Sequence, residues 1–141
     1  MSTVPFQIQF FAPGIAAPQG SKTRTRWGMR ESSQRVGPWR DAVEQAATQA
    51  MEDEHMLGPL SPPYRVTLAF LIKKPRTTRA KEPVAPTIGD IDKLARSTHD
   101  ALTSAGLIED DRFIVLAEQS KRWAAPGENA GAWIVVAEAH G

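Results

Sequence analysis

The sequence predicts an α/β (α+β) domain in which two helices pack on a small mixed β-sheet of about four strands. Three observations support this prediction: four segments have the residue spacing of strands, two have that of helices, and their order is β-α-β-α-β-β. The length of 141 residues suits one domain with its own core, so we expect a single domain over residues 1–141. Hydrophobic residues make up 41% of the chain and charged residues 23%, which is ordinary for a globular protein.

The first expected elements are a strand and a helix separated by a long irregular segment. Residues 4–11 alternate apolar side chains with glutamines, which is typical of a half-buried strand. Residues 12–37 are rich in Gly, Pro, Ser and Arg and predict a long loop or a loose hairpin, and loops of this length are usually functional or mobile. A helix is expected from Pro38, a residue that the first helical turn tolerates, to about residue 54.

The middle of the chain predicts a strand, a loop and a second helix. Residues 64–73 have an apolar residue at every second position and predict a strand. Residues 75–86 contain three prolines and basic side chains, so we expect an exposed loop. A helix is expected over residues 91–105, with Asp90 as its N-cap and Gly106 as its C-terminal stop.

Two further strands are expected over residues 112–122 and 131–139. The segment between them, residues 124–130, contains proline, glycine and asparagine and predicts a hairpin that would pair these strands.

Composition excludes several classes of protein. No run of eighteen apolar residues exists, which excludes a transmembrane helix. There is no charged segment followed by an apolar block at the N-terminus, so we expect no secretory signal and a cytoplasmic protein without a membrane partner. The absence of cysteine excludes disulfides, thiol catalysis and cysteine-ligated zinc.

Basic residues gather in two stretches although the net charge is only +1. Such stretches on a nearly neutral chain indicate a surface for a polyanion, with Trp27 as a candidate for stacking on an exposed base. Solvated loops made soluble by charge are an equally good explanation of either stretch alone. The basic residues are Lys22, Arg24, Arg26, Arg30, Arg35 and Arg40, then Lys73, Lys74, Arg76, Arg79 and Lys81.

Five aspartates lie between residues 90 and 111, namely Asp90, Asp92, Asp100, Asp110 and Asp111. Carboxylates held within a few ångströms raise each other's pKa unless a metal or a basic group neutralises them. Oxygen ligands suit Mg²⁺ or Mn²⁺, so this cluster predicts a metal-dependent phosphodiester-cleaving enzyme. A solvated helix face with weak ion pairs is the alternative explanation. The three histidines are scattered, and we expect His99 on the surface, with an approach to the acidic face as the alternative.

The spaced acidic residues resemble the signature of RusA-type Holliday junction resolvases. The matching residues are Asp90-Ile91-Asp92-Lys93-Leu94-Ala95-Arg96, then Asp100-Ala101-Leu102, then Asp110-Asp111. Weaker matches occur at Pro18-Gln19-Gly20-Ser21-Lys22, at Trp39-Arg40 and at Ser120-Lys121-Arg122, so the resemblance covers most of the chain.

This resemblance implies a RusA-like fold and a homodimeric, Mg²⁺-dependent endonuclease that resolves four-way DNA junctions, often encoded by phages or prophages. No small-molecule cofactor is implied, and Mn²⁺ is an alternative metal. By position, Asp90, Asp92 and Asp111 would be catalytic metal ligands, Asp110 a further ligand and Asp100 a supporting acid. Arg96 takes the place of the catalytic lysine of the family, and the implied DNA-binding residues are Lys22, Arg24, Arg26, Arg30, Lys73, Lys74, Arg76, Lys93 and Lys121.

Two departures from the family pattern leave a question about proton transfer. Lys93 stands where the family has asparagine, and Arg96 replaces the lysine. Arginine can neutralise a phosphate but cannot give up a proton, so Arg96 serves by charge or Lys93 has taken over the proton transfer.

The geometry of the acids also leaves alternatives open. A helix of fifteen residues is roughly 20 Å long, so Asp111 reaches Asp90 only if the helix is short or bent, if the next strand runs back beside it, or from a partner subunit. A non-catalytic nucleic-acid-binding protein and a general flap or single-strand nuclease remain the alternative functions.

Overall fold

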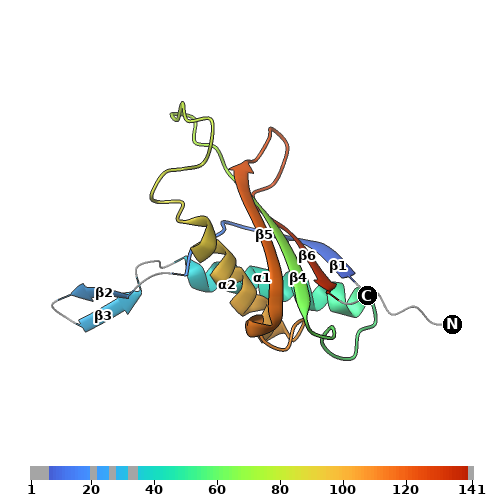
Figure 1. Cartoon of the computed structure of the whole chain (residues 1–141). Coiled ribbons are helices and arrows are strands. Elements are labelled where there is room, and N and C mark those ends of the chain that lie inside the picture. The colour runs from blue at the N-terminus through green and yellow to red at the C-terminus, as the bar shows by residue number, and fades with distance from the viewer. Residues whose placement is uncertain (1–6, 20–21, 26–27, 32–34, 140–141) are drawn as a thin grey trace.

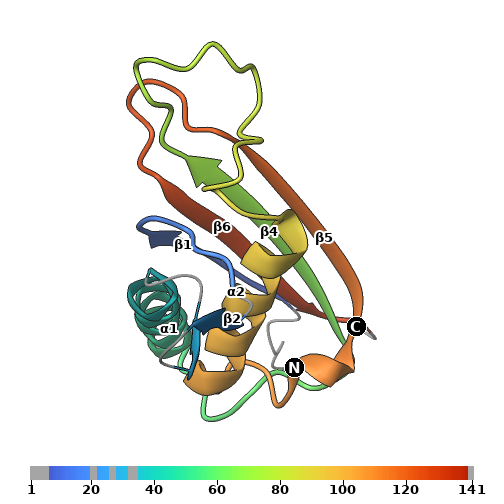
Figure 2. The same cartoon turned by 90° about the vertical axis from the view of Figure 1, so that its left-hand side faces the viewer.

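The computed structural model describes residues 7–19, 22–25, 28–31 and 35–139, and it confirms the predicted order of strands and helices. Four strands form the main sheet, and two helices pack on one of its faces (Figures 1 and 2). The elements of this body are β1 (Gln7–Pro13), α1 (Val36–Asp53), β4 (Tyr64–Ile72), α2 (Ile91–Ala105), β5 (Ile114–Trp123) and β6 (Gly131–Glu138).

The main sheet has the strand order β1-β6-β4-β5. β6 is antiparallel to both β1 and β4, whereas β5 is parallel to β4. The predicted hairpin between β5 and β6 is therefore wrong, because β4 lies between these strands and residues 124–130 connect them across it. A parallel pair needs a crossover of a dozen or more residues, and the segment with α2 provides it between β4 and β5.

A separate two-stranded sheet confirms the loose-hairpin alternative for the segment after β1. Strand β2 (Lys22–Thr25) pairs antiparallel with β3 (Gly28–Glu31). This small sheet projects away from the main body near the start of α1 (Figure 1).

The core lies between the main sheet and the two helices. Val66, Leu68 and Phe70 of β4 are buried at alternate positions, as the sequence predicted for this face. The ring of Trp39 on α1 packs on that of Phe70 with centroids 6.5 Å apart, and its indole nitrogen donates a buried hydrogen bond of 3.1 Å to Thr98 Oγ1 on α2. Burying a large apolar side chain stabilises a fold by about 1.5–3 kcal/mol, so this layer fixes α2 on the sheet.

No helix in the described part of the chain covers the opposite face of the main sheet (Figure 2). Trp133 on this face is 43% exposed and packs against Phe11 at 5.1 Å between ring centroids. At the start of the edge strand β5, Val115 is 65% and Leu116 is 48% exposed.

Neither α1 nor α2, the two α-helices of the described residues, is long and apolar enough to cross a membrane.

Candidate active site at the start of helix α2

Two aspartates stand at the N-terminal end of α2. Asp90 occupies the predicted N-cap position, and its backbone carbonyl accepts hydrogen bonds from the amides of Lys93 and Leu94 at 3.1 and 3.0 Å. Its carboxylate, however, makes no capping hydrogen bond to the described backbone of α2 and is 74% exposed, 4.0 Å from Lys93 Nζ. Asp92 is exposed in the first turn. The positive end of the helix dipole favours both negative charges at this place.

The chain before α2 is fixed in place by the segment that follows β1. Gly89 has a φ of +100°, and a Cβ at this position would stand 2.7 Å from the ring of Pro18, so only glycine fits the turn. The amide of Gln19 donates to the carbonyl of Lys93 at 3.0 Å, and Ser97 Oγ donates to the carbonyl of Ala17 at 2.7 Å. These contacts give the weak sequence match around Pro18-Gln19 a physical role, since they position the start of α2.

Basic side chains surround the two acids. Lys121 on β5 donates from Nζ to the backbone carbonyl of Gly89 at 3.0 Å, next to Asp90. Arg96 is exposed one helical turn beyond Asp92, on the same side of α2. Lys93 is half-buried near Asp90. The start of α2 therefore combines two carboxylates with three cations from two elements.

The other predicted acids lie at the opposite end of α2. Gly106 ends this helix in the left-handed conformation, with φ +82°, as predicted. The short 3₁₀ helix η1 (Asp111–Phe113) then begins at Asp111, and Asp110 Oδ1 accepts from the amide of Arg112 at 3.0 Å. That hydrogen bond lowers the pKa of Asp110. The pKa of Asp111 is raised, first by partial burial and then by its contact with Asp110 and the charge of Asp100.

His99 belongs to this second cluster, so the preferred surface position is wrong and the alternative, an approach to the acidic residues, describes it better. The side chain is partly buried, and Nε2 is inaccessible and has no hydrogen-bond partner in the part of the chain that the structure describes. Burial lowers the pKa of His99, while the nearby Asp111 acts in the opposite direction. Helical spacing places His99 at the border between the buried and exposed arcs of α2, so the sequence held no decisive signal for its burial.

The two acidic clusters do not meet within one chain. α2 has 15 residues, which at about 1.5 Å per residue separates its ends by roughly 22 Å. β5 runs back beside α2 (Figure 2). Asp111, however, comes before the first residue of β5 and follows the C-terminal end of α2, so it lies at the end of the helix opposite Asp90. Among the described residues, no group of three or more acids or histidines is close enough to hold one metal ion. Of the arrangements that the sequence left open, the one in which Asp111 joins Asp90 and Asp92 within a single subunit is thus not found among the described residues.

The sequence model of the endodeoxyribonuclease RusA family matches residues 15–129, which include β2, both helices and β5. The chain belongs to the RusA endodeoxyribonuclease family. No curated protein sequence matches the chain. Membership makes the protein an endonuclease that hydrolyses phosphodiester bonds in DNA, and it confirms the family that the sequence resembled.

The residues present at the start of α2 have the chemistry to hold a divalent metal ion. Mg²⁺ commonly takes one or two carboxylates together with substrate phosphates and waters. Asp90 and Asp92 provide two such groups, and the Asp90 carboxylate is not used as a helix cap. The two carboxylates at the start of α2 could therefore hold such an ion in this RusA-family chain, and Asp110 and Asp111 are separate from them.

The predicted DNA-binding residues of this RusA-family protein fall in three places. Lys93 and Lys121 lie beside Asp90, as described above. Lys73, Lys74 and Arg76 are exposed on the loop between β4 and α2. Lys22, Arg24 and Arg30 lie on the strands of the small sheet, where the structure describes their backbone. Arg26 and the candidate stacking residue Trp27 lie outside the described residues.

Proposed function

We propose that this RusA-family endonuclease is a Mg²⁺-dependent enzyme that resolves four-way DNA junctions. The observation that supports the proposal most is the uncapped Asp90 carboxylate beside the exposed Asp92, with Lys93, Arg96 and Lys121 around them. Mg²⁺, or Mn²⁺ in its place, would supply an activated water and charge stabilisation for the departing oxygen. Asp90 and Asp92 would hold it.

The basic residues of the site would bind the phosphates of the DNA. Lys121 is oriented by its hydrogen bond to Gly89, which keeps its charge next to Asp90. Arg96 has a planar guanidinium that can bind a phosphate through two hydrogen bonds, and it would act by charge because it does not release its proton. Lys73, Lys74 and Arg76 would hold a DNA arm through phosphate contacts, which position the substrate without reading its sequence.

The proposal includes a homodimer that acts in the cytoplasm. A two-fold dimer suits a junction in which two strands of like polarity must be cut. Two observations support it: the sheet face with Trp133 and Phe11 has no helix on it in the described part of the chain, and Val115 and Leu116 are exposed at the sheet edge. We further propose that Asp111 serves the site of the partner subunit, since it lies far from Asp90 in its own chain.

The catalytic assignment is tested with a synthetic four-way junction. Asp92→Asn should abolish Mg²⁺-dependent cleavage while junction binding stays intact or becomes tighter, because a repulsive charge is removed. Asp53→Asn, an exposed aspartate at the end of α1, is the matched control and should cleave normally. Normal cleavage by Asp92→Asn would show that the metal-ligand assignment is wrong. Cleavage of flaps or linear strands at the same rate as junctions would favour a general nuclease.

The role of Asp111 is tested by coexpressing two inactive variants, Asp92→Asn and Asp111→Asn. If Asp111 acts on the partner's site, a mixed dimer has one site with both changes and one intact site. About half of the dimers are mixed, so about a quarter of all sites should nick the junction. If Asp111 acts within its own chain, both sites of the mixed dimer carry a change and no nicking returns.

A further inference from the structure

An apolar pocket lies next to the proposed active site, at the end of the sheet where β4 and β5 finish. It has a volume of about 300 Å³ and lies under the loop between β4 and α2. Ile72, Ile88 and Trp123 contribute apolar surface, and Thr78 and Thr87 contribute hydroxyl groups. Arg35 and Lys73, both exposed, also line it. The pocket thus combines apolar walls and a few polar groups with positive charge.

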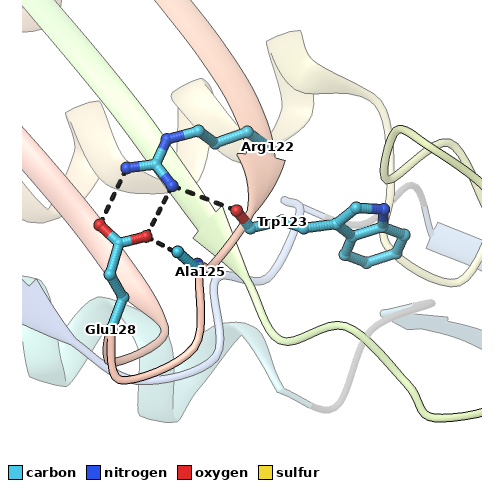
Figure 3. A network of polar contacts seen from close by, with 4 residues as sticks. All are labelled: Arg122, Trp123, Ala125 and Glu128. Carbon is cyan, nitrogen blue, oxygen red and sulfur yellow. Dashed lines mark hydrogen bonds and ion pairs between the residues drawn. The ribbon is translucent and has the colours of Figure 1, made fainter.

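Hydrogen bonds hold the walls of this pocket in place. Trp123 Nε1 donates to the carbonyl of Ala80 at 2.9 Å, which ties the loop to the end of β5. The amide of Ala124 donates to the carbonyl of Ile72 at 2.7 Å and joins the ends of β5 and β4. Figure 3 shows the Trp123 ring turned away from the neighbouring Arg122–Glu128 pair. The pocket is therefore formed before any ligand arrives.

The pocket and the proposed catalytic acids share one segment of chain. Ile88 lines the pocket and stands two residues before Asp90. Gly89, between them, is held by Lys121. A DNA strand whose phosphate lies at Asp90 and Asp92 would therefore pass close to the pocket.

We propose that this pocket binds one unstacked nucleobase of the DNA substrate. A nucleobase has flat apolar faces and a polar edge, which match the aromatic and aliphatic walls and the two threonine hydroxyls. Its nucleotide carries a negative phosphate, which matches Arg35 and Lys73. The volume is at the lower end of the range for ligand pockets, about 300–1,000 Å³, and suits a single small ring system. The inference rests on the proposed function in one respect, that branched DNA with unpaired or strained bases is the substrate.

Filling the pocket should weaken DNA binding. Ala85 lines the pocket and is exposed, so Ala85→Phe would place a ring there without disturbing the core. Stacking of a base on protein contributes about 1–3 kcal/mol, so affinity for a four-way junction should fall about 5- to 150-fold. Val84→Phe is the matched control, because Val84 is the adjacent exposed residue and is not part of the pocket lining; it should bind like the wild type. Thr87→Phe blocks the same pocket from a second exposed position.

A scan with abasic junctions identifies the base. Each junction carries one abasic nucleotide near the crossover, and affinity is measured by fluorescence anisotropy without Mg²⁺. At the position whose base enters the pocket, the abasic nucleotide should lower the affinity of the wild type by the same factor as the Ala85→Phe change does. It should not lower the affinity of the Ala85→Phe variant any further. If both pocket variants bind like Val84→Phe, or if no abasic position shows this coupling, the inference is overturned.

The two proposals fail separately in this design. Binding without Mg²⁺ does not depend on cleavage, so coupled losses in a protein that cuts no junction would support the base pocket and reject the proposed function. Junction cleavage without any coupled loss would reject the pocket alone.

Discussion

The ammonium group of Lys121 donates a hydrogen bond of 3.0 Å to the backbone carbonyl of Gly89, the residue directly before Asp90. Lys121 lies on β5, where it is opposite Phe70 of the parallel strand β4. The bond therefore connects the edge of the main sheet to the turn that starts α2. It holds a positive charge at the residue before Asp90 and limits the freedom of that turn.

Removing the positive charge of Lys121 should slow DNA cleavage more than it weakens DNA binding. Lys121→Met keeps the aliphatic stem but loses the ammonium, so we expect a loss on the order of 10²-fold in the single-turnover cleavage rate, comparable to the loss of one charge-stabilising donor. Lys74→Met, on the exposed loop, should affect affinity and its salt dependence instead. Equal effects of both changes on both measurements would show that Lys121 is a general phosphate contact.

Substitutions at Arg96 test whether the residue at the position of the family's catalytic lysine acts by its charge. If charge is enough, Arg96→Lys should cleave at nearly the wild-type rate with an unchanged pH–rate profile, whereas Arg96→Gln should lose most activity. Both variants are measured at saturating protein over a range of pH. A lysine variant that is faster than the wild type and gains a new pH dependence would show that a transferable proton is needed at this position, because arginine does not provide one.

Local patterns in the sequence were sufficient for most elements of the fold. The apolar arc of α2 and the glycine at Gly106 predicted the bounds of that helix, because burial and a left-handed C-terminal residue leave direct traces in the sequence. The pairing of β5 was not predictable in the same way. Residues 124–130 have the composition of a turn, but a turn sequence does not show whether a third strand lies between the two strands it joins.

The candidate site was predictable in its residues but not in its arrangement. The spacing from Asp90 to Asp111 identified the family, and Lys121 was among the predicted basic residues. The separation of Asp90 from Asp111 follows from the straight run of α2 and the position of η1, which depend on tertiary packing. The pocket beside Trp123 was missed because its lining comes from segments far apart in the chain.

The buried contact between the two helices should contribute measurably to stability. Thr98 Oγ1 accepts from Trp39 Nε1 at 3.1 Å and also donates to the carbonyl of Leu94 at 2.8 Å. Thr98→Val preserves the shape but leaves the buried indole N–H without its partner, so the free energy of unfolding should fall by about 1–3 kcal/mol. Urea denaturation measures this loss. Thr103→Val removes a hydroxyl that bonds to the carbonyl of His99 in its own helix and should cost less; an equal cost would argue against a special role for the interhelical bond.

Glu128 provides a pH-dependent contribution to stability at the turn between β5 and β6. Its carboxylate accepts two hydrogen bonds from Arg122, at 2.7 and 3.0 Å, and one from the amide of Ala125 at 2.7 Å (Figure 3). These contacts, with the Arg122 bond foremost, lower the pKa of Glu128 from 4.5 to about 2. A lowered pKa in the folded state means that the unfolded chain binds the proton more readily, so this stabilisation is complete above pH 4.5 and is lost as the pH falls toward 2.

The melting temperature as a function of pH tests this contribution. Glu128→Gln should melt below the wild type at neutral pH, and the gap should narrow through the window from pH 4.5 to about 2, where the wild-type carboxylate becomes protonated. Glu118→Gln changes an exposed glutamate on β5, outside this turn, and controls for the loss of one negative charge. A gap that stays constant down to pH 2 would show that the Arg122 contact does not depend on the charge of Glu128, because only an ionised carboxylate gains from the neighbouring guanidinium.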